Sequence, residues 1–522
     1  MSEPATAAPP VGRGRQPLLL LLLAVVGLVA WSIGTEYYTL VATAKHSIAR
    51  VSSYVRPLSI DTTRNHDDIY PEEIFTKNWV DAVPVKDMTH LSSLHIACTQ
   101  YKDSVIPWDL TLDGKGPEIL INETDPDVYN KLRQCPDVDI YIGRGLRGFG
   151  YCEDAVAYAK FMRGRLIPKW VVEKNFFDPQ MGKTGISYHE LCPDTPMLFL
   201  NHYWDGLPDD PKWPAGKPMY LMPNIEMYEL GASHYRRADV VICKTVVCDK
   251  YLRKWLVQEG NPTNTQVIFA RHTSSNLANY ARVQLGDDAI APKNFKDPKF
   301  LHVVGGSIQK ATGNVLDCWL SRPDLPPLDI YIADDLYEGA YKKRYDARIK
   351  TSLNVKVHPG RVDSVSLGKI VAEAAFFMCP SFQEGYGHYI NQARAAGGLV
   401  VTPDVAPMNE LITPKSGVLF QAGAVASHEQ FLGGKSQHAN GLRNVTGFVA
   451  TFGGKEICKA VDTVIFNMTP EQRQERAERA KQQYYFDTLY FAEKMQELRV
   501  LNKGKSTFLR RETVVPPFET GT

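Results

Sequence analysis

Residues 376–411 decide the fold and read FFMCPSFQEGYGHYINQARAAGGLVVTPDVAPMNEL. The apolar start ends in Pro-Ser, and Glu384 follows, directly before a turn that contains two glycines. A helical pattern then continues to Gly397-Gly398, after which residues 399–401 form a second apolar run. Strand, glycine turn, helix and strand make a βαβ unit, in which free backbone N–H groups at the helix start are available to a phosphate. The stretch therefore predicts a parallel sheet with an anion site at the turn.

Two earlier stretches fit the same domain. Residues 299–332 contain a strand, a loop with Gly305-Gly306 and Lys310, and a helix. Residues 354–375 supply a further strand and helix directly before the Glu384 loop. Three elements in this order are a strong combined signal.

These stretches resemble the donor half of the retaining GT-B glycosyltransferases of family 4, on the motif Pro-Ser-x-x-Glu-Gly-Tyr-Gly followed by Ala-Ala-Gly-Gly-x-Val-Val. The resemblance implies that Lys310 contacts a donor diphosphate and that Glu384 binds donor-sugar hydroxyls, both as catalytic residues. The loop residues that it places around the donor are Gly305, Gly306, Gly385, Tyr386 and Gly387.

One position departs from the family pattern. The family has a second glutamate eight positions after the first, where this chain has Gln392. A glutamine can still hydrogen-bond ribose hydroxyls but carries no charge. We therefore expect Gln392 to bind the nucleotide, and a glutamate there to bind it more tightly by about 1 kcal/mol.

The expected fold class is α/β, with two Rossmann-like doubly wound domains that face a cleft. The resemblance implies an acceptor domain at 91–290, a nucleotide-sugar donor domain at 298–470 and a helix at 471–501 that crosses back over both, followed by a tail at 502–522. Alternating apolar and helical stretches predict a parallel sheet in the first domain. The strands expected there are 94–98, 118–121, 138–142, 197–200, 218–222, 240–243 and 267–270. No Gly-x-Gly-x-x-Gly follows the run at 94–98, which disfavours a dinucleotide-dependent dehydrogenase.

The acceptor side is less clearly marked. Asn224 and Glu226 follow the strand at 218–222, where many members of the resembled family carry a histidine. They either face the cleft as catalytic residues or cap the next helix, and the sequence leaves both open. Further cleft candidates that follow strand ends are His202, Trp204 and His272.

The chemistry predicted for this site needs no metal or cofactor. Breaking a sugar–diphosphate bond leaves negative charge on the phosphate, which a lysine and helix N-terminal amides stabilise. The Asp-x-Asp triplets at 125–127 and 137–139 are the candidates for metal binding, and the second opens an apolar strand. The net charge is +1, without a basic block, so we expect a nucleotide sugar and a glycan as partners and no nucleic acid.

The N-terminus predicts a membrane anchor. Residues 1–17 form a polar tail with two arginines, residues 18–34 carry no charge, and residues 35–90 are expected to be a stem. The uncharged run spans about 25 Å as a helix, at the lower limit for crossing a bilayer. By the positive-inside rule we expect a single-pass type II protein of the Golgi or ER membrane, with its catalytic part in the lumen. The alternative is a signal peptide cleaved after Ala44.

Other residues are compatible with a location in the lumen but do not require it. Glycosylation sequons begin at Asn122, Asn444 and Asn467. Of nine cysteines, those expected to be buried free thiols are Cys243, Cys248 and Cys379. One disulfide is expected among Cys135, Cys152 and Cys192, and no cysteine pair has zinc-ligand spacing with a histidine.

The sequence thus predicts a transferase that moves a hexose from a nucleotide sugar to a glycan or glycoconjugate, with retention implied by the resemblance. Two alternatives remain open. They are an inactive GT-B protein that binds glycan or nucleotide, and a nucleotide-sugar epimerase.

Overall fold

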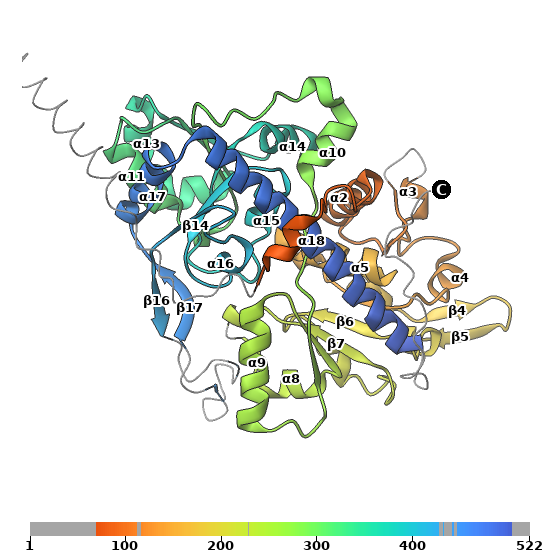
Figure 1. Cartoon of the computed structure of the whole chain (residues 1–522). Helices are drawn as coiled ribbons and strands as arrows, with labels where there is room; N and C mark the ends of the chain where they lie inside the picture. The colour runs from red at the N-terminus through yellow and green to blue at the C-terminus, as the bar shows by residue number, and fades with distance from the viewer. Residues whose placement is uncertain are drawn as a thin grey trace, which may run out of the picture. The chain divides into compact units, whose positions relative to one another are not determined.

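The structure is a computed structural model that describes residues 69–111, 116–227, 229–426, 432, 441–442 and 446–503. The predicted tail, anchor and first part of the stem, the sequon at Asn444, and the tail from residue 504 lie outside these residues. Within them, no helix combines the length and apolar character needed to cross a membrane. The described residues all belong to one compact unit, shown in Figure 1. We call residues 69–285 its N-terminal half and residues 300–466 its C-terminal half.

The N-terminal half is built on a sheet in the order β1-β3-β2-β6-β7-β8-β9, parallel except for β1. Its five inner strands are buried along their whole length, which is typical of a parallel sheet covered on both faces. The strands are β1 (Ile106–Pro107), β2 (Asp139–Tyr141), β3 (Arg165–Ile167), β6 (Met197–Leu200), β7 (Met219–Met222), β8 (Val240–Cys243) and β9 (Gln266–Phe269).

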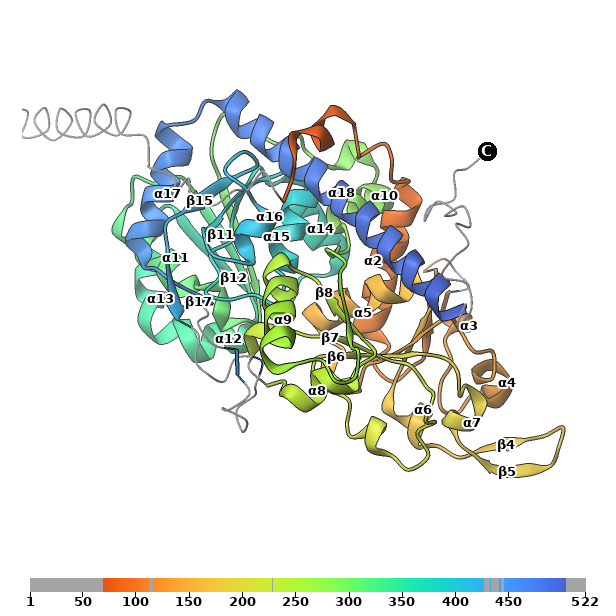
Figure 2. The ribbon, with the colours of Figure 1, turned by 60° about the horizontal axis from the view of Figure 1, so that its bottom comes forward.

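Helices and a small hairpin complete this half. The helices are α2 (Val85–Gln100), α3 (Gly116–Ile119), α4 (Val128–Leu132), α5 (Phe149–Met162), α6 (Lys169–Glu173), α7 (Tyr188–Leu191), α8 (Ala232–Arg237), α9 (Val246–Glu259) and α10 (Leu277–Leu285). The hairpin pairs β4 (Phe176–Asp178) with β5 (Lys183–Ile186) and projects at one end of the half in Figure 2.

Two of the predicted strands were wrong. Residues 94–98 lie within helix α2, where the buried residues Met88, Leu91 and Leu94 recur every three positions. A short apolar run does not by itself separate a buried strand from a buried helix, and here the helical period extends well before the run. Residues 118–121 form the end of α3 and a single bridge between Ile121 and Val105.

The C-terminal half contains a six-stranded, fully parallel sheet in the order β12-β11-β10-β13-β14-β15. The predicted βαβ unit is confirmed as β13 (Phe376–Met378), α15 (His388–Ala395) and β14 (Leu399–Pro403). The other strands are β10 (Phe300–Gly305), β11 (Leu328–Ile332), β12 (Val355–Pro359) and β15 (Val418–Phe420), and β16 (Gly423–Ala426) pairs with β17 (Thr446–Thr451) outside the sheet. The helices include α11 (Thr312–Ser321), α12 (Asp334–Leu336), α13 (Lys342–Thr351), α14 (Ser364–Glu373), α16 (Met408–Leu411) and α17 (Gly454–Phe466). Two parallel sheets with helices between their strands confirm the predicted α/β class.

A long final helix joins the two halves. Helix α18 (Pro470–Lys503) contacts α15 and β14 of the C-terminal half and α5 of the N-terminal half. Figures 1 and 2 both show it running from the side of α17 to the side of α5. The described end of the predicted stem also packs here, since Tyr70 is buried and its hydroxyl donates to Asp487 of α18 at 2.5 Å.

The described residues contain four disulfides, which confirm part of the cysteine predictions and correct the rest. Cys135–Cys192 is the one disulfide expected among Cys135, Cys152 and Cys192, and Cys152 pairs with Cys98 instead. The prediction of free thiols at Cys243 and Cys248 was wrong, because these two cysteines are bonded to each other. Among the described residues only Cys379 is a free, buried cysteine. The pairs are Cys98–Cys152, Cys135–Cys192, Cys243–Cys248 and Cys318–Cys458. Three of them join positions 54 or more residues apart, and tertiary packing alone brings such partners together.

Candidate active site

Lys310 and Glu384 lie on neighbouring loops of the C-terminal half. Strands β10 and β13 are paired in parallel, so the loops that follow them leave the same edge of the sheet. The two loops are joined by a hydrogen bond from the Phe382 N–H to the Gln309 carbonyl at 2.9 Å. Lys310 forms an ion pair with Glu384, and its ammonium lies 3.6 Å from the centroid of the Tyr389 ring. Both charged side chains are nearly buried, at 13% and 11% exposure, and their geometry is therefore held before any ligand binds.

The carboxylate of Glu384 is also held by its own loop. Ser381 donates a hydrogen bond to Glu384 and shares a second one with the Tyr389 hydroxyl at 2.5 Å. Burial raises the pKa of Tyr389 well above its ordinary value of 10.0, so this hydroxyl keeps its proton.

Asn224 and Glu226 of the N-terminal half lie directly against this loop. A Cβ atom added to Gly385 would lie 2.5 Å from Asn224 Oδ1 and 2.8 Å from Glu226 Oε1, so only glycine fits at this approach. Asn224 donates to the Tyr151 hydroxyl at 3.4 Å, while its Oδ1 is buried without a hydrogen-bond partner in the described part of the chain. The structure therefore brings both side chains to the loop that carries Glu384. Part of the alternative also holds, since Glu226 lies in the first turn of a short 3-10 helix, Ile225–Met227, that follows Asn224. The side-chain oxygen of Asn224 accepts no cap hydrogen bond from this helix.

Glu226 has a strongly altered acidity. Its pKa rises from an ordinary 4.5 to about 7, chiefly because of burial and to a lesser degree because of the charges of Glu384 and Asp154, against the lowering by a backbone hydrogen bond and by Lys244. Near neutral pH this carboxyl group is partly protonated. It can therefore donate a hydrogen bond or a proton, as a dissociated carboxylate cannot.

Four charged or titratable residues meet beside the Glu384 loop, of which only His272 was predicted. Asp154 of α5 accepts from Lys244, which follows β8, at 2.9 and 3.0 Å. His272 Nε2, after β9, and His388 Nε2, at the start of α15, lie 2.9 and 3.1 Å from Asp154 Oδ1. Lys244 follows a predicted strand end, a signal that could have identified it. Asp154 carries no such mark.

This cluster has the composition of a cation site but its charge is already balanced. Asp154, His272 and His388 offer ligand atoms within 4.8 Å of one another. The Lys244 ammonium, however, donates to both oxygens of Asp154, and the charged groups around Asp154 hold its pKa well below the ordinary value despite burial. Burial lowers the pKa of His272 to about 4, so this ring is neutral. The four residues therefore form a buried network between the halves.

Gln392 also contacts the opposite half. Its amide donates to Glu153 of α5 at 2.7 Å, and Glu153 in turn accepts from the backbone and hydroxyl of Ser275. The ribose contact expected for Gln392 stays a prediction, because its amide nitrogen is engaged in this bond between the halves.

The remaining donor-loop residues shape the backbone. Tyr386 is buried and donates to the His272 carbonyl at 2.7 Å, so the loop is tied to the end of β9. Gly387 and Gly305 have φ of +105° and +60°, values that favour glycine, and Gly306 directly follows Gly305 at the end of β10.

Aromatic side chains extend the site along the end of β6. His202 Nδ1 lies 2.9 Å from Glu229, and Trp204 stacks on His234 with ring centroids 4.7 Å apart. Tyr203, between the two predicted residues, meets Tyr151 edge-on at 5.5 Å. Because the Tyr151 hydroxyl accepts from Asn224, this aromatic group adjoins the Asn224 side of the site.

The chain matches no family model and no curated protein. Among solved structures, sucrose-phosphate synthase from Thermosynechococcus elongatus is similar at 12% identity over 70% of this chain and 98% of that chain, with a TM-score of 0.45. A glycosyltransferase from Rickettsia africae is similar at 11% identity over 71% of this chain and 99% of that chain, with a TM-score of 0.48. The Anabaena protein HepE, solved with UDP and glucose, is similar at 15% identity over 58% of this chain and 78% of that chain, with a TM-score of 0.38. These TM-scores lie below 0.5, so we argue the function from the residues of the site.

Proposed function

We propose that this protein is a glycosyltransferase that moves a hexose from a nucleotide sugar to a glycan or glycoconjugate, with retention of configuration and without an essential metal. The observation that carries the proposal is the meeting of Lys310 and Glu384 on adjacent loops with Asn224 and Glu226 of the other half across Gly385. Lys310 supplies a cation for the diphosphate, and Glu384 supplies a carboxylate for sugar hydroxyls. The partly protonated carboxyl group of Glu226 lies against the loop that carries Glu384.

The proposed roles follow from charge. When a nucleotide sugar binds, its diphosphate competes with Glu384 for the Lys310 ammonium, which then stabilises negative charge on the leaving phosphate. Glu384, released from the ion pair, accepts hydrogen bonds from the sugar. Glu226 and Asn224 lie on the acceptor side, and the aromatic group around His202 and Trp204 offers faces on which a sugar ring can stack. Retention and the hexose rest on the resemblance of the donor motif.

The first experiment measures transfer by the purified protein from a panel of nucleotide sugars. Lys310→Ala and Glu384→Ala are each expected to lower kcat/KM at least about tenfold, a cost of about 1.4 kcal/mol in transition-state stabilisation. Lys299→Ala is the matched control, because Lys299 is exposed at the far end of β10 and pairs with Asp329 at 2.6 Å. Full activity in both site variants would remove the proposal.

An inactive protein that binds a nucleotide or a glycan is the second candidate. It is favoured by the position of Gln392, whose amide is bonded to Glu153 rather than free for a ribose. Nucleoside diphosphate binding without transfer or donor hydrolysis, across the same panel, would support this candidate.

We further propose that the protein is a type II membrane protein of the Golgi or ER with its catalytic part in the lumen. The uncharged run at 18–34 supports an anchor, and four disulfides support an oxidising compartment. The expected result is resistance to carbonate extraction, with the original N-terminus retained. A mature chain that begins at Lys45 would indicate a cleaved signal peptide instead.

A further inference from the structure

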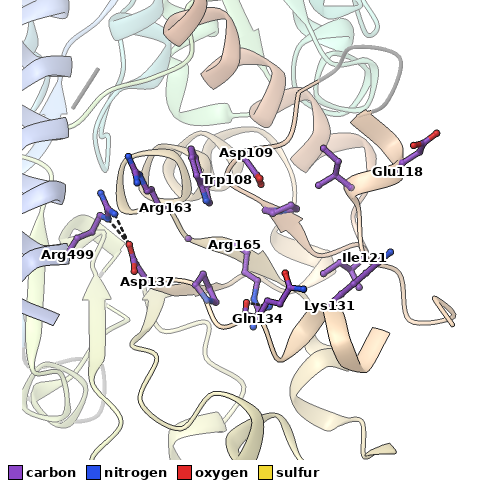
Figure 3. A pocket seen from close by; sticks show the side chains of 14 residues that line it. Trp108, Asp109, Glu118, Ile121, Lys131, Gln134, Asp137, Arg163, Arg165 and Arg499 are labelled. Carbon is purple, nitrogen blue, oxygen red and sulfur yellow. Dashed lines mark hydrogen bonds and ion pairs between the residues drawn. The ribbon is translucent and has the colours of Figure 1, made fainter. Parts of the chain in front are cut away.

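One cavity lies away from the candidate active site. Its volume is about 480 Å³. The residues that line it lie at the end of β1 and just before β2 and β3, and Arg499 near the end of α18 lies at one side (Figure 3). His202 and Asn224 follow the opposite, carboxyl ends of the parallel strands β6 and β7. The cavity therefore opens at the other edge of the sheet from the residues proposed for transfer.

Most cations around the cavity are already neutralised. Arg165 pairs with Asp139 at 2.7 Å, Arg499 pairs with Asp137 at 2.7 Å, and Lys131 pairs with Asp125 at 2.5 Å. The dashed lines in Figure 3 show the Arg499 pair at the cavity wall. An anionic ligand would have to break such pairs, so the cavity does not favour one.

Trp108 and Arg163 form a fixed platform in the cavity. The Arg163 guanidinium lies 5.4 Å from the centre of the Trp108 ring, and the backbone N–H of Trp108 donates to the Gly164 carbonyl at 2.9 Å. Arg163 ends helix α5 with φ of +50°, a conformation that usually selects glycine, and its side chain is exposed. Trp108 is half-buried, so part of its ring faces the cavity.

Polar groups that can bind a ligand surround this platform. Asp109 and Glu118 are exposed and, among the described residues, neither belongs to an ion pair. Gln134 is also exposed and can both donate and accept. The cavity thus presents an aromatic ring together with carboxylates, an amide and a guanidinium. These groups fit a ligand with closely spaced hydrogen-bond donors and acceptors.

We propose that this cavity is a carbohydrate-binding site, separate from the transfer site, that holds a neutral oligosaccharide. Sugar hydroxyls donate to carboxylates and accept from a guanidinium, and the C–H face of a pyranose packs on an aromatic ring. The volume lies within the range of small-ligand pockets, about 300–1,000 Å³. The site would hold a glycan at the edge of the sheet opposite the transfer site, whether or not transfer occurs.

The test is calorimetric titration of the full chain with four neutral probes and one anionic probe. The neutral probes are maltotetraose, cellotetraose, mannotetraose and chitotetraose, and the anionic probe is a heparin tetrasaccharide. At least one neutral probe is expected to bind, and Trp108→Ala is expected to weaken that binding at least about tenfold. Gln134→Ala, at an exposed position, is expected to weaken it several-fold, which keeps the test valid if Trp108→Ala fails to fold.

Two controls locate the binding. Trp170→Ala removes another partly exposed tryptophan of the same half and is expected to bind the probe as the wild type does. Lys310→Ala alters the proposed transfer site and is expected to leave probe binding unchanged. The proposal is overturned if no neutral probe binds at millimolar concentration, if only the heparin probe binds, if Lys310→Ala abolishes binding, or if both cavity variants bind as tightly as the wild type.

Discussion

Glu226 is a carboxyl group buried between two other acids, and its altered pKa makes stability depend on pH. In the unfolded chain it ionises near its ordinary value of 4.5, whereas in the folded protein its pKa is about 7. The contribution of protonated Glu226 to the free energy of unfolding is therefore fully present below pH 4.5. As pH rises through 7, a contribution on the order of 3 kcal/mol is lost.

The substitution Glu226→Gln is expected to reduce this loss. Between pH 5 and 8 the free energy of unfolding of the variant should fall less steeply than that of the wild type, because the amide does not ionise. Urea denaturation at several pH values measures the free energy of unfolding of both proteins. In the difference between the two values, the contributions of the other titrating groups cancel. Parallel pH profiles would mean that Glu226 keeps an ordinary pKa.

Gln392 shows why a family pattern cannot be restored by one substitution. The sequence alone predicts tighter nucleotide binding for Gln392→Glu, but in the structure this side chain lies 2.7 Å from the Glu153 carboxylate. Two carboxylates would then face each other in a nearly buried contact, with a hydrogen-bond donor removed. We expect a loss of about 1–3 kcal/mol in the free energy of unfolding.

Thermal unfolding at neutral pH measures this loss, with Gln392→Met as an uncharged control of similar length. The loss in the glutamate variant is expected to shrink as pH falls toward 4, since protonation restores a donor. A stable glutamate variant that binds nucleoside diphosphate more tightly would contradict the contact with Glu153 and favour the ribose role.

Helix α9 begins under a cap from the opposite half of the molecule. Thr245 accepts from the Cys248 N–H at 3.2 Å, and Glu410 of α16 accepts from the Val246 and Val247 N–H groups at 2.6 and 2.8 Å. The first three N–H groups of the helix, which have no partner within it, are thus satisfied, two of them by a residue more than 160 positions away.

Glu410→Ala is expected to cost about 1–2 kcal/mol and to loosen the start of α9. Hydrogen exchange should rise at the Val246 and Val247 amides. The matched control is Asp363→Ala, which removes a cap from α14 within a single half and should raise exchange at Val365 and Ser366 instead. Unchanged exchange at the start of α9 in the Glu410 variant would rule out this cap.

At the scale of the molecule, Asp487 of α18 ties three parts of the chain together. It pairs with Arg271 after β9 at 2.8 Å and with Arg394 of α15, and it accepts from Tyr70 of the N-terminal segment at 2.5 Å. Arg394 is fully buried, so its charge depends on this partner.

Asp487→Ala would leave two arginines without their carboxylate and is expected to cost about 3–5 kcal/mol. Glu338→Ala is the control, because it breaks an exposed ion pair with Lys342 four residues away and should cost less than about 1 kcal/mol. Chemical denaturation compares the two variants. Equal and small losses would mean that the buried network does not hold the two halves together.

The sequence by itself determined the local order of the C-terminal half. The run from Phe376 to Val401 alternates a fully apolar strand, a glycine turn and an amphipathic helix, and these depend on residues close in the chain. The strands that precede Asn224, His272 and Lys310 were predictable for the same reason. The helix at 85–100 was missed, because its start was assigned to the stem and its apolar run at 94–98 to a strand; a five-residue run is compatible with either period.

Only the tertiary structure decided which of these residues meet. The contact of Asn224 and Glu226 with Gly385, the bond of Gln392 to Glu153, and the Asp154 network all join the two halves across more than 100 residues of chain. The disulfide partners and the polar cavity at Trp108 arise in the same way, from strand order and helix packing. Local patterns carry no information on these contacts, because each depends on how elements far apart in the chain pack after they have formed.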